Sequence, residues 1–427
     1  MSAMFSALSV RNYRVYAAGA LVSNTGTWMG RVAQDWVVLT ELTDNSASAL
    51  GIVTGLQFLP MLLLAPLGGA LGDRFAKRRV MLVTQSMMAL TAVLMGVLVL
   101  GGAMELWHMY VLAFAQGAAA AIDAPARQAF VSEMVPPEQL TNAVGLNSAS
   151  FNSGRLIGPG VAGLLIAAFG PGPTLLINAA TFVAVLCALI ALDPAELTPA
   201  PRSRGKGRIR EGVRYVRGRP DIMLIMVLVF VHGTFGMNFQ LTNALMATEV
   251  FDRGVKDFGL VGSVMAIGSL GGALLAARQE RPRWRRLLGA LGGFTVCTLA
   301  AALAPSWTLY VVFLVPTGLF ALTVMVTANS MVQLSVEPAV RSRVMSLYMA
   351  VFFGGTPLGA PMIGWIGDTF GARWTILIAT IMCGTAAVAA TIYLMRTDDL
   401  HVHRGHSLTR PLVLVRGPVH AMPEPVA

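Results

Sequence analysis

Long stretches without Asp, Glu, Lys or Arg recur along the whole chain and dominate its pattern of hydrophobic and polar positions. A helix needs about 20 mostly apolar residues to cross the roughly 30 Å of hydrocarbon in a bilayer. Most stretches have this length, and two longer ones are broken into helical hairpins at residues 170–173 and 305–306. The pattern therefore predicts an all-α integral membrane protein with twelve transmembrane helices, near residues 13–40, 48–71, 79–102, 106–131, 140–169, 173–192, 221–248, 257–278, 287–304, 307–335, 343–370 and 374–395.

Residues 193–220 form a long polar segment inside the chain and are rich in Pro, Arg and Gly. This segment divides the predicted helices into two sets of six. We therefore expect a first six-helix bundle over residues 1–192, a cytoplasmic linker over 193–220 and a second bundle over 221–395. The remaining residues, 396–427, are expected to be a cytoplasmic tail that is partly disordered.

The composition agrees with a membrane protein and argues against two other classes. Hydrophobic residues make up 55% of the 427 residues and charged residues only 12%, against about 25% charged in soluble domains. A soluble enzyme is therefore disfavoured, and so is a nucleic-acid-binding protein, despite the net charge of +10. The arginines instead gather in the loops on one side of the predicted topology, which the positive-inside rule makes the cytoplasmic side. We expect a multi-pass protein of the bacterial plasma (inner) membrane, with both termini in the cytoplasm.

Motifs for catalysis or cofactor binding are missing from the sequence. There is no HExxH, GxSxG or Walker A pattern, and the three cysteines lie singly in apolar runs. We therefore expect no enzyme activity, no cofactor, no metal site and no nucleic-acid partner. The expected partners are a small-molecule substrate, protons and the lipid bilayer, and no sequence feature argues for more than a monomer.

The second half of the chain repeats the first at an offset of 201 residues. The identical positions in the fifth and eleventh predicted helices include three glycine pairs: Gly154 with Gly355, Gly158 with Gly359, and Gly163 with Gly364. Two copies of a six-helix unit in the same orientation are typical of parallel-repeat transporters, whose halves enclose a site near the middle of the membrane.

The segment between the second and third predicted helices carries a resemblance to a known family. Residues 68–79, GGALGDRFAKRR, resemble the loop motif GxLaDrxGrkr of the major facilitator superfamily, and the matching residues include Gly69, Gly72, Asp73, Arg74 and Arg78. Small residues allow two helices to approach closely. Asp73 can face the positive N-terminal end of a neighbouring helix, so we expect it to hold the cytoplasmic side shut.

The fifth predicted helix carries a second motif of the same superfamily. Residues 154–163, GRLIGPGVAG, are similar to the antiporter motif gxxxGPxxGG through Gly154, Gly158, Pro159 and Gly163. The glycines form a flat face for close packing, and the proline can kink the helix. In the superfamily this motif accompanies export rather than uptake. A helix that serves packing alone is the alternative.

Residues 24–36 and 123–143 narrow the resemblance to the enterobactin-exporter-like branch, which includes actinobacterial multidrug efflux proteins. The resemblance implies the fold of the superfamily, in which the first, fourth, seventh and tenth helices line the substrate cavity. The sequence departs from many drug antiporters at residues 113–117, AFAQG, where the fourth helix lacks their arginine. A proton relay must therefore use other residues.

Few ionisable residues lie inside the predicted helices, and each is a functional candidate because a charge in hydrocarbon costs at least about 2.5 kcal/mol. Arg31 and Asp35 are spaced to pair on the first helix, Asp123 and Arg127 on the fourth, and Arg155 lies in the fifth. Burial favours a neutral carboxyl group and a neighbouring arginine favours an ionised one. We expect Asp35 to be the leading proton-coupling carboxylate and Asp123 the second. The alternative for each pair is a static ion pair that fixes helix packing.

Contacts with the substrate are predicted from aromatic and polar side chains on the first and seventh helices, namely Trp28, Met29, Gln34, His232, Asn238 and Gln240. A hydrogen-bonded structural role is the alternative for His232. The function that follows is secondary active export of amphipathic small molecules, such as drugs or a siderophore, by alternating access with proton antiport. The alternatives are a proton-coupled importer of a small metabolite and a non-transporting membrane sensor.

Overall fold

The computed structural model describes the chain over residues 3–198, 209–277, 283–397, 400–407 and 410–416. Within these ranges, only the backbone is described for residues 3–4, 65–74, 209–210, 276–277, 338–339, 342, 397, 400–407 and 410–416.

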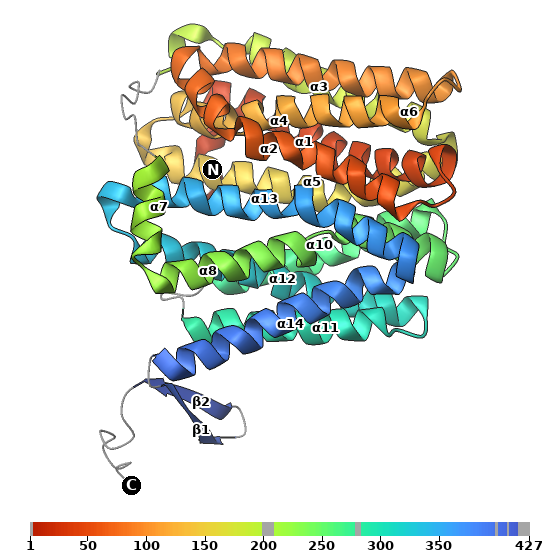
Figure 1. The fold of residues 1–427 in the computed structure, drawn as a ribbon. Coiled ribbons are helices and arrows are strands. Elements are labelled where there is room, and N and C mark those ends of the chain that lie inside the picture. The colour runs from red at the N-terminus through yellow and green to blue at the C-terminus, as the bar shows by residue number, and fades with distance from the viewer. Residues whose placement is uncertain (1–2, 199–208, 278–282, 398–399, 408–409, 417–427) are drawn as a thin grey trace.

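Long helices run back and forth across the molecule in two bundles, one from each half of the chain (Figure 1). The first half contributes α1 (Arg11–Val37), α2 (Ala47–Arg74), α3 (Lys77–Leu100), α4 (Leu106–Met134), α5 (Leu140–Phe169) and α6 (Pro171–Ala191). The second half contributes α8 (Pro220–Val231), α9 (Phe239–Leu245), α10 (Val255–Ala277), α11 (Trp284–Ala302), α12 (Trp307–Ser335), α13 (Pro338–Phe370) and α14 (Ala372–Thr397). Each predicted transmembrane span corresponds to one of these helices or, for the seventh, to a broken segment.

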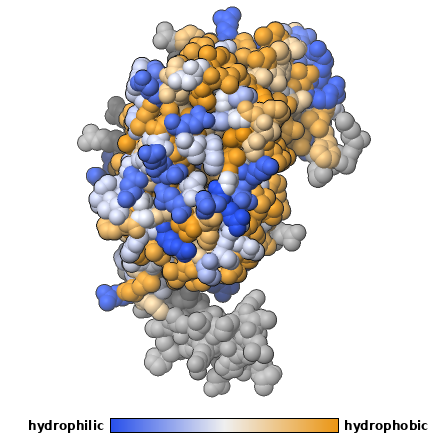
Figure 2. Space-filling view, turned by 90° about the vertical axis from the view of Figure 1, so that its right-hand side faces the viewer, coloured by the Kyte–Doolittle hydropathy of each residue, from blue (hydrophilic) through white to orange (hydrophobic). Residues whose placement is uncertain are grey.

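The surface of the two bundles is that of a membrane protein. Within the described residues, eight helical segments are long and apolar enough to cross a membrane. The remaining long helices, α1, α4, α5 and α11, pack beside them in the same bundles. Figure 2 looks onto one end of the molecule, where hydrophilic residues gather near the centre with hydrophobic residues around them. The predicted all-α, multi-pass architecture is confirmed.

The connections between helices lie at two opposite ends of the bundles (Figure 1). The linker end carries the short helix α7 (Ile209–Arg217) and the turns at residues 75–76 and 135–139. The loop end carries the turns at residues 43–46 and 251–254. By the charge distribution of the sequence, the linker end is the predicted cytoplasmic side.

The seventh predicted span, expected as one helix over residues 221–248, is interrupted. A π-helical turn, η5 (His232–Gly236), follows α8, and a second one, η6 (Met246–Val250), follows α9. The Asn238 side chain donates a 2.7 Å hydrogen bond to the carbonyl oxygen of Thr234, which competes with the regular helical ladder. The predicted span is confirmed as one apolar segment, Pro220–Val250, but its helix is interrupted before α9, where the Asn238 side chain bonds to the backbone.

The repeated glycines occupy equivalent positions in the two halves. A Cβ atom on Gly154 or Gly158 of α5 would lie 2.8 Å or 2.7 Å from atoms of α1. A Cβ atom on Gly355 of α13 would lie 2.7 Å from Thr234 in η5, and one on Gly359 would overlap the Thr234 carbonyl oxygen. The fifth and eleventh helices therefore approach the first and seventh at backbone distance, which supports the repeat inferred from the sequence.

The hydrophobic core shows where the two halves meet. One cluster of buried residues joins both halves near the loop end, with Leu50 and Ile166 from the first half and Leu245, Phe258 and Ile363 from the second. Towards the linker end, the buried clusters of the described residues each belong to a single half. The halves are therefore packed together at the loop end and have separate cores at the linker end.

We expect Gly359→Ala to lower the thermal stability of the purified protein. The added methyl group would overlap the Thr234 carbonyl oxygen, and such overpacking costs about 1–3 kcal/mol. Gly292→Ala is the matched control, because a Cβ atom there meets nothing within 4 Å on helix α11. Unfolding temperatures in detergent should fall for the first variant and stay level or rise for the second; equal temperatures would contradict the packing described here.

Two further elements were not predicted from the sequence. Helix α7 lies within the linker, where Glu211 forms a 2.9 Å ion pair with Arg343 of α13. In the tail, β1 (Leu400–Ser407) and β2 (Arg410–Arg416) pair as an antiparallel hairpin. Helix α7 is thus attached to the second half of the chain, whereas linker residues 199–208 lie outside the described part.

Candidate transport site between the two halves

A carboxylate from the second half caps a helix of the first half at the loop end. Asp368, near the end of α13, accepts hydrogen bonds from the backbone N–H groups of Ala47 at 2.7 Å and Ser48 at 2.9 Å, and from the Ser46 hydroxyl at 3.3 Å. These groups form the N-terminus of α2, which attracts negative charge. Asp368 therefore links the two halves where they are packed together.

The Asp368 contact is the same kind of interaction, a carboxylate at a helix N-terminus, as the one predicted for Asp73 at the linker end. The two halves of the chain have opposite roles in the two contacts. The sequence predicts that Asp73, at the end of α2, faces a helix N-terminus and closes the cytoplasmic side. At the loop end, α13 supplies the carboxylate and α2 supplies the helix N-terminus. A transporter that alternates must break the Asp368 cap whenever the loop end opens.

We expect Asp368→Asn to shift the protein towards an open loop end by about tenfold, since hydrogen bonds to a charged acceptor contribute about 1.5–3 kcal/mol each and an amide retains part of them. Asp193→Asn is the matched control, because Asp193 caps a short helix within the first half. Spin labels at residues 44 and 253, in a background without the three native cysteines, report the separation across the loop end by double electron–electron resonance. An unchanged distance distribution in Asp368→Asn would contradict a latch role.

The antiporter-like motif of α5 has two faces. Gly154 and Gly158 pack against α1, whereas a Cβ atom on Gly163 would lie 2.8 Å from the Val255 carbonyl oxygen of α10. Pro159 lies against Gly262 of α10, where an added Cβ would be 2.9 Å from the proline ring. The motif therefore holds α1 on one side and forms the contact with the second half on the other.

Asp35 lies buried between the two halves, with 3% of its surface exposed. Its Oδ2 atom has no hydrogen-bond partner among the described residues. The side chain of Gln240, from α9 in the second half, interacts with the carboxyl group. Asp35 is thus the one predicted coupling residue that the structure brings into contact with the opposite half.

The expected ion pair between Arg31 and Asp35 does not form in this structure. No nitrogen of Arg31 lies within 4.0 Å of the Asp35 carboxylate, although the two charges still interact electrostatically. The Arg31 guanidinium lies instead over two aromatic rings, 5.0 Å from the centroid of Trp28 and 5.1 Å from that of Phe58. The pairing was mispredicted because i, i+4 spacing permits contact but cannot exclude a competing aromatic face.

Arg155 of α5 joins the same group of side chains. Its guanidinium lies 5.7 Å from the Trp28 ring, and Phe151 contacts that ring edge-on at 5.8 Å between centroids. We call Trp28, Arg31, Phe58, Phe151 and Arg155 the arginine–aromatic cluster. It gathers residues from α1, α2 and α5 on the first half of the chain.

Asp123 and Arg127 form the predicted ion pair on α4, with a 2.8 Å contact from Nη2 and a 3.0 Å contact from Nε to Oδ2. Oδ1 of Asp123 accepts two further hydrogen bonds, from Thr84 at 2.7 Å and from Gln85 at 2.9 Å. Arg127 also donates to Asn24 of α1 at 3.1 Å. Four donor atoms from three side chains surround this carboxylate, so the geometry favours the static ion pair at this position.

Three glutamine side chains from three helices form a chain beside Asp35. Gln57 of α2 donates to Gln34 of α1 at 2.7 Å, and Gln34 donates to Gln116 of α4 at 2.8 Å. Gln34 was predicted as a substrate contact but is buried, with 1% of its surface exposed. Gln57 was missed because a single uncharged polar residue in an apolar helix carries no signal of its partners.

Two other residues predicted to contact substrate are buried in hydrophobic cores. His232 is fully buried against Cys383 of α14 and the Phe294 ring of α11, inside the core of the second half. Met29 is 2% exposed and belongs to the shared core. Neither side chain is brought to an accessible surface between the halves, so the structural alternative fits His232 better than substrate contact.

The remaining predicted residues are the substrate candidates Asn238 and Gln240 and the residues of the loop motif. Asn238 serves the break in the seventh helix, and Gln240 interacts with Asp35. Arg78 of the loop motif donates to the Leu189 and Ile190 carbonyl oxygens at the end of α6, at 2.7 Å and 3.0 Å, entirely within the first half. For residues 65–74 the structure describes only the backbone, which is helical. The contacts predicted for Gly69, Gly72, Asp73 and Arg74 of the loop motif therefore lie outside the description.

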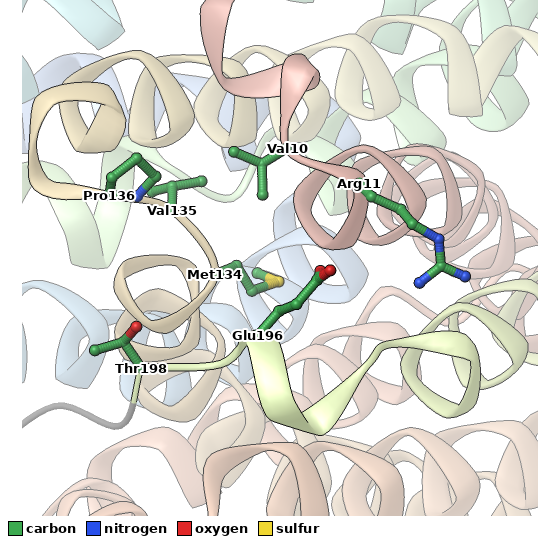
Figure 3. Close-up of a pocket in the computed structure, with 7 residues that line it drawn as sticks. All are labelled: Val10, Arg11, Met134, Val135, Pro136, Glu196 and Thr198. Carbon is green, nitrogen blue, oxygen red and sulfur yellow. The ribbon is translucent and has the colours of Figure 1, made fainter.

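A surface pocket lies at the linker end of the first half (Figure 3), lined by Val10, Arg11, Met134, Val135, Pro136, Glu196 and Thr198. Residues 11 and 28 of α1 are separated by about 25 Å at 1.5 Å per residue. The pocket is therefore distant from the arginine–aromatic cluster and from Asp35, and it contains none of the residues predicted to bind substrate.

Comparison with known proteins decides the family. A model of the transmembrane secretion effector family matches residues 2–421. The chain belongs to this family. It is therefore a multi-pass transporter of the major facilitator superfamily and not an enzyme, as the sequence motifs predicted.

The relatives of this chain include proteins named for drug efflux and one named for siderophore transport. The chain is 27% identical over 398 residues to the multidrug efflux pump Tap of Mycolicibacterium fortuitum, covering 89% of this chain and 95% of that one. It is 26% identical over 364 residues to the staphyloferrin A transporter of Staphylococcus aureus, covering 83% and 89%. The macrolide efflux protein A of Streptococcus pyogenes is 23% identical over 378 residues, covering 85% and 91%.

Solved transporter structures share the fold of this chain. A bacterial homologue of the human lysosomal transporter Spinster superposes with a TM-score of 0.72 at 16% identity, covering 91% of this chain and 98% of that one. A D-xylose–proton symporter gives a TM-score of 0.67 at 14% identity, covering 88% and 95%. The predicted major facilitator fold is confirmed.

Proposed function

We propose that this protein is a proton-driven exporter of amphipathic small molecules, with both termini in the cytoplasm of a bacterial cell. The observation that carries the proposal is the position of Asp35. Its carboxyl group is buried between the halves, has an unpartnered oxygen among the described residues, and interacts with Gln240 of the opposite half.

Alternating access would change the surroundings of this carboxyl group. When the loop end is closed, Asp35 is enclosed by the shared core and interacts with Gln240. Opening of the loop end would move α9 away from α1, remove Gln240 and admit water and protons from outside. For proton-driven export, Asp35 would take up a proton in this state and release it to the cytoplasm after the loop end has closed, so that one proton moves inward as the substrate moves outward.

Export rather than uptake is supported by the α5 motif and by the names of the relatives. Gly163 and Pro159 of that motif form the contact with α10, so they close the loop end from which the substrate would leave. Two of the named relatives are efflux proteins. The concentration of arginines at the linker end supports a cytoplasmic position for that end.

The test begins with a strain that lacks the gene, compared with the same strain carrying it on a plasmid. Susceptibility to tetracycline, erythromycin and ethidium, together with growth under iron limitation, identifies an exported compound. Inverted membrane vesicles should then accumulate that compound when a proton gradient is imposed, and an uncoupler should abolish the accumulation. Accumulation by right-side-out vesicles instead would support the importer, and no gradient-dependent movement in either would contradict the proposal.

A further inference from the structure

Two cations of the first half share one aromatic ring in the arginine–aromatic cluster. The guanidinium groups of Arg31 and Arg155 lie 5.0 Å and 5.7 Å from the Trp28 ring centroid. They come from different helices, α1 and α5, and the glycines at 154 and 158 bring these helices to backbone contact beside Trp28. The close approach of two like charges is thus built into the packing of the fold.

Neither guanidinium has an ion pair or a hydrogen bond within the described part of the chain, whereas Arg127, Arg219 and Arg343 each pair with a carboxylate. An arginine carries five N–H donors in a planar fork that matches a carboxylate or phosphate group. Aromatic faces offset part of the charge but accept few of these donors. In the middle of a membrane protein, ten donors without acceptors indicate a site whose acceptor comes from elsewhere.

Asp35 does not supply this acceptor. It lies beyond 4.0 Å from Arg31 and interacts with Gln240 of the other half. Even if Asp35 is ionised, one carboxylate cannot balance two guanidinium groups. The cluster keeps an excess of positive charge in every protonation state of Asp35.

The cluster is also accessible. Phe151 is 49% exposed, and Trp28, Arg31, Phe58 and Arg155 are partly exposed. Phe151 and Arg155 precede Pro159 in α5, so they lie towards the linker end from the contact of Pro159 with Gly262 of α10. At the linker end the buried clusters of the described residues belong to single halves.

We propose that the arginine–aromatic cluster binds the anionic group of the exported substrate, which is then an amphipathic oxyanion: a carboxylate, phosphate or sulfonate attached to a flat apolar body. Arg31 and Arg155 hold the oxyanion, and Trp28, Phe58 and Phe151 contact the apolar body. The proposal rests on the proposed export function and names its substrate class.

Binding to the purified protein in phosphatidylcholine nanodiscs tests this proposal without transport. The probes share one aromatic body and differ in charge: 1-pyrenebutyrate, neutral 1-pyrenebutanol and cationic 4-(1-pyrenyl)butyltrimethylammonium. Pyrene anisotropy is read after subtraction of empty nanodiscs. We expect 1-pyrenebutyrate to bind about tenfold or more tightly than either analogue. Equal or tighter binding of the cationic analogue would overturn the proposal.

Substitutions in the arginine–aromatic cluster test whether it causes the preference for the anionic probe. Arg31→Gln and Arg155→Gln should each weaken 1-pyrenebutyrate binding by about tenfold and leave 1-pyrenebutanol binding unchanged, while Arg155→Lys should recover part of the loss. Arg285→Gln, at an exposed arginine of α11, is the control. The neutral probe reports whether each variant is folded. Unchanged 1-pyrenebutyrate binding in both glutamine variants would overturn the proposal.

A lipid phosphate offers the same chemistry as a free carboxylate, and nanodiscs containing phosphatidylglycerol distinguish the two sources. Displacement of 1-pyrenebutyrate by this lipid would assign the site to an anionic lipid headgroup, and undiminished binding would assign it to a soluble oxyanion. The result of these binding experiments does not depend on the result of the transport experiments that test the proposed function. Charge-selective binding without proton-driven movement in vesicles would overturn export and leave the binding site standing.

Discussion

Asp35→Asn should abolish proton-driven accumulation of the exported compound in inverted vesicles while leaving exchange of labelled for unlabelled compound measurable. Asparagine keeps the size of the side chain and its contact with Gln240, but it has no titratable proton. Without the coupling group the protein can only equilibrate the compound across the membrane. Gradient-driven accumulation should therefore fall by about 100-fold, towards the level of empty vesicles, while exchange continues.

The control for this variant is Asp44→Asn, which changes an exposed carboxylate in the turn at residues 43–46, at the loop end. It should accumulate the compound like the unchanged protein. If Asp35→Asn retained full proton-driven accumulation, the coupling group would have to be another residue, and the assignment of Asp35 would be wrong.

Arg127→Met should lower the free energy of unfolding by about 3–5 kcal/mol, because it leaves the buried Asp123 carboxylate without its cation. Thr84 and Gln85 would still donate to Oδ1, but Oδ2 would lose both of its contacts. The Asn24 side chain of α1 would lose its donor as well. Unfolding in detergent, followed by the loss of helical circular dichroism, measures the change.

The double variant Asp123→Asn with Arg127→Met separates the two roles considered for this pair. It removes both charges, so most of the lost stability should return, and proton-driven accumulation should remain near that of the unchanged protein. A stable double variant that no longer couples export to protons would show that Asp123 carries a proton. The static ion pair would then be the wrong interpretation.

Much of the fold was predictable because membrane insertion imposes a length on each apolar stretch. The spans follow from stretches without charge, and the repeated glycines are visible because close helix packing excludes a side chain at Gly158 and Gly359 alike. The break in the seventh helix was not predictable from hydropathy. It depends on Asn238 bonding to a carbonyl four residues earlier, which leaves the apolar pattern unchanged.

The candidate site was predictable as a set of residues but only partly as an arrangement. Arg31, Asp35 and Arg155 were predicted because few ionisable residues lie inside the transmembrane helices. All three lie together on the first half. Their partners were not predictable, because the side chains that contact them come from other helices. Asp368 was missed since its capped groups lie 320 or more residues away in sequence.

Proton movement through the reconstituted protein shows whether Asp35 couples export to protons. Liposomes with the pH indicator pyranine trapped inside should report a proton flux when the exported compound is added to the unchanged protein. We expect this flux for the unchanged protein and none above empty liposomes for Asp35→Asn. A compound-dependent flux of equal size in Asp35→Asn would contradict this role of Asp35.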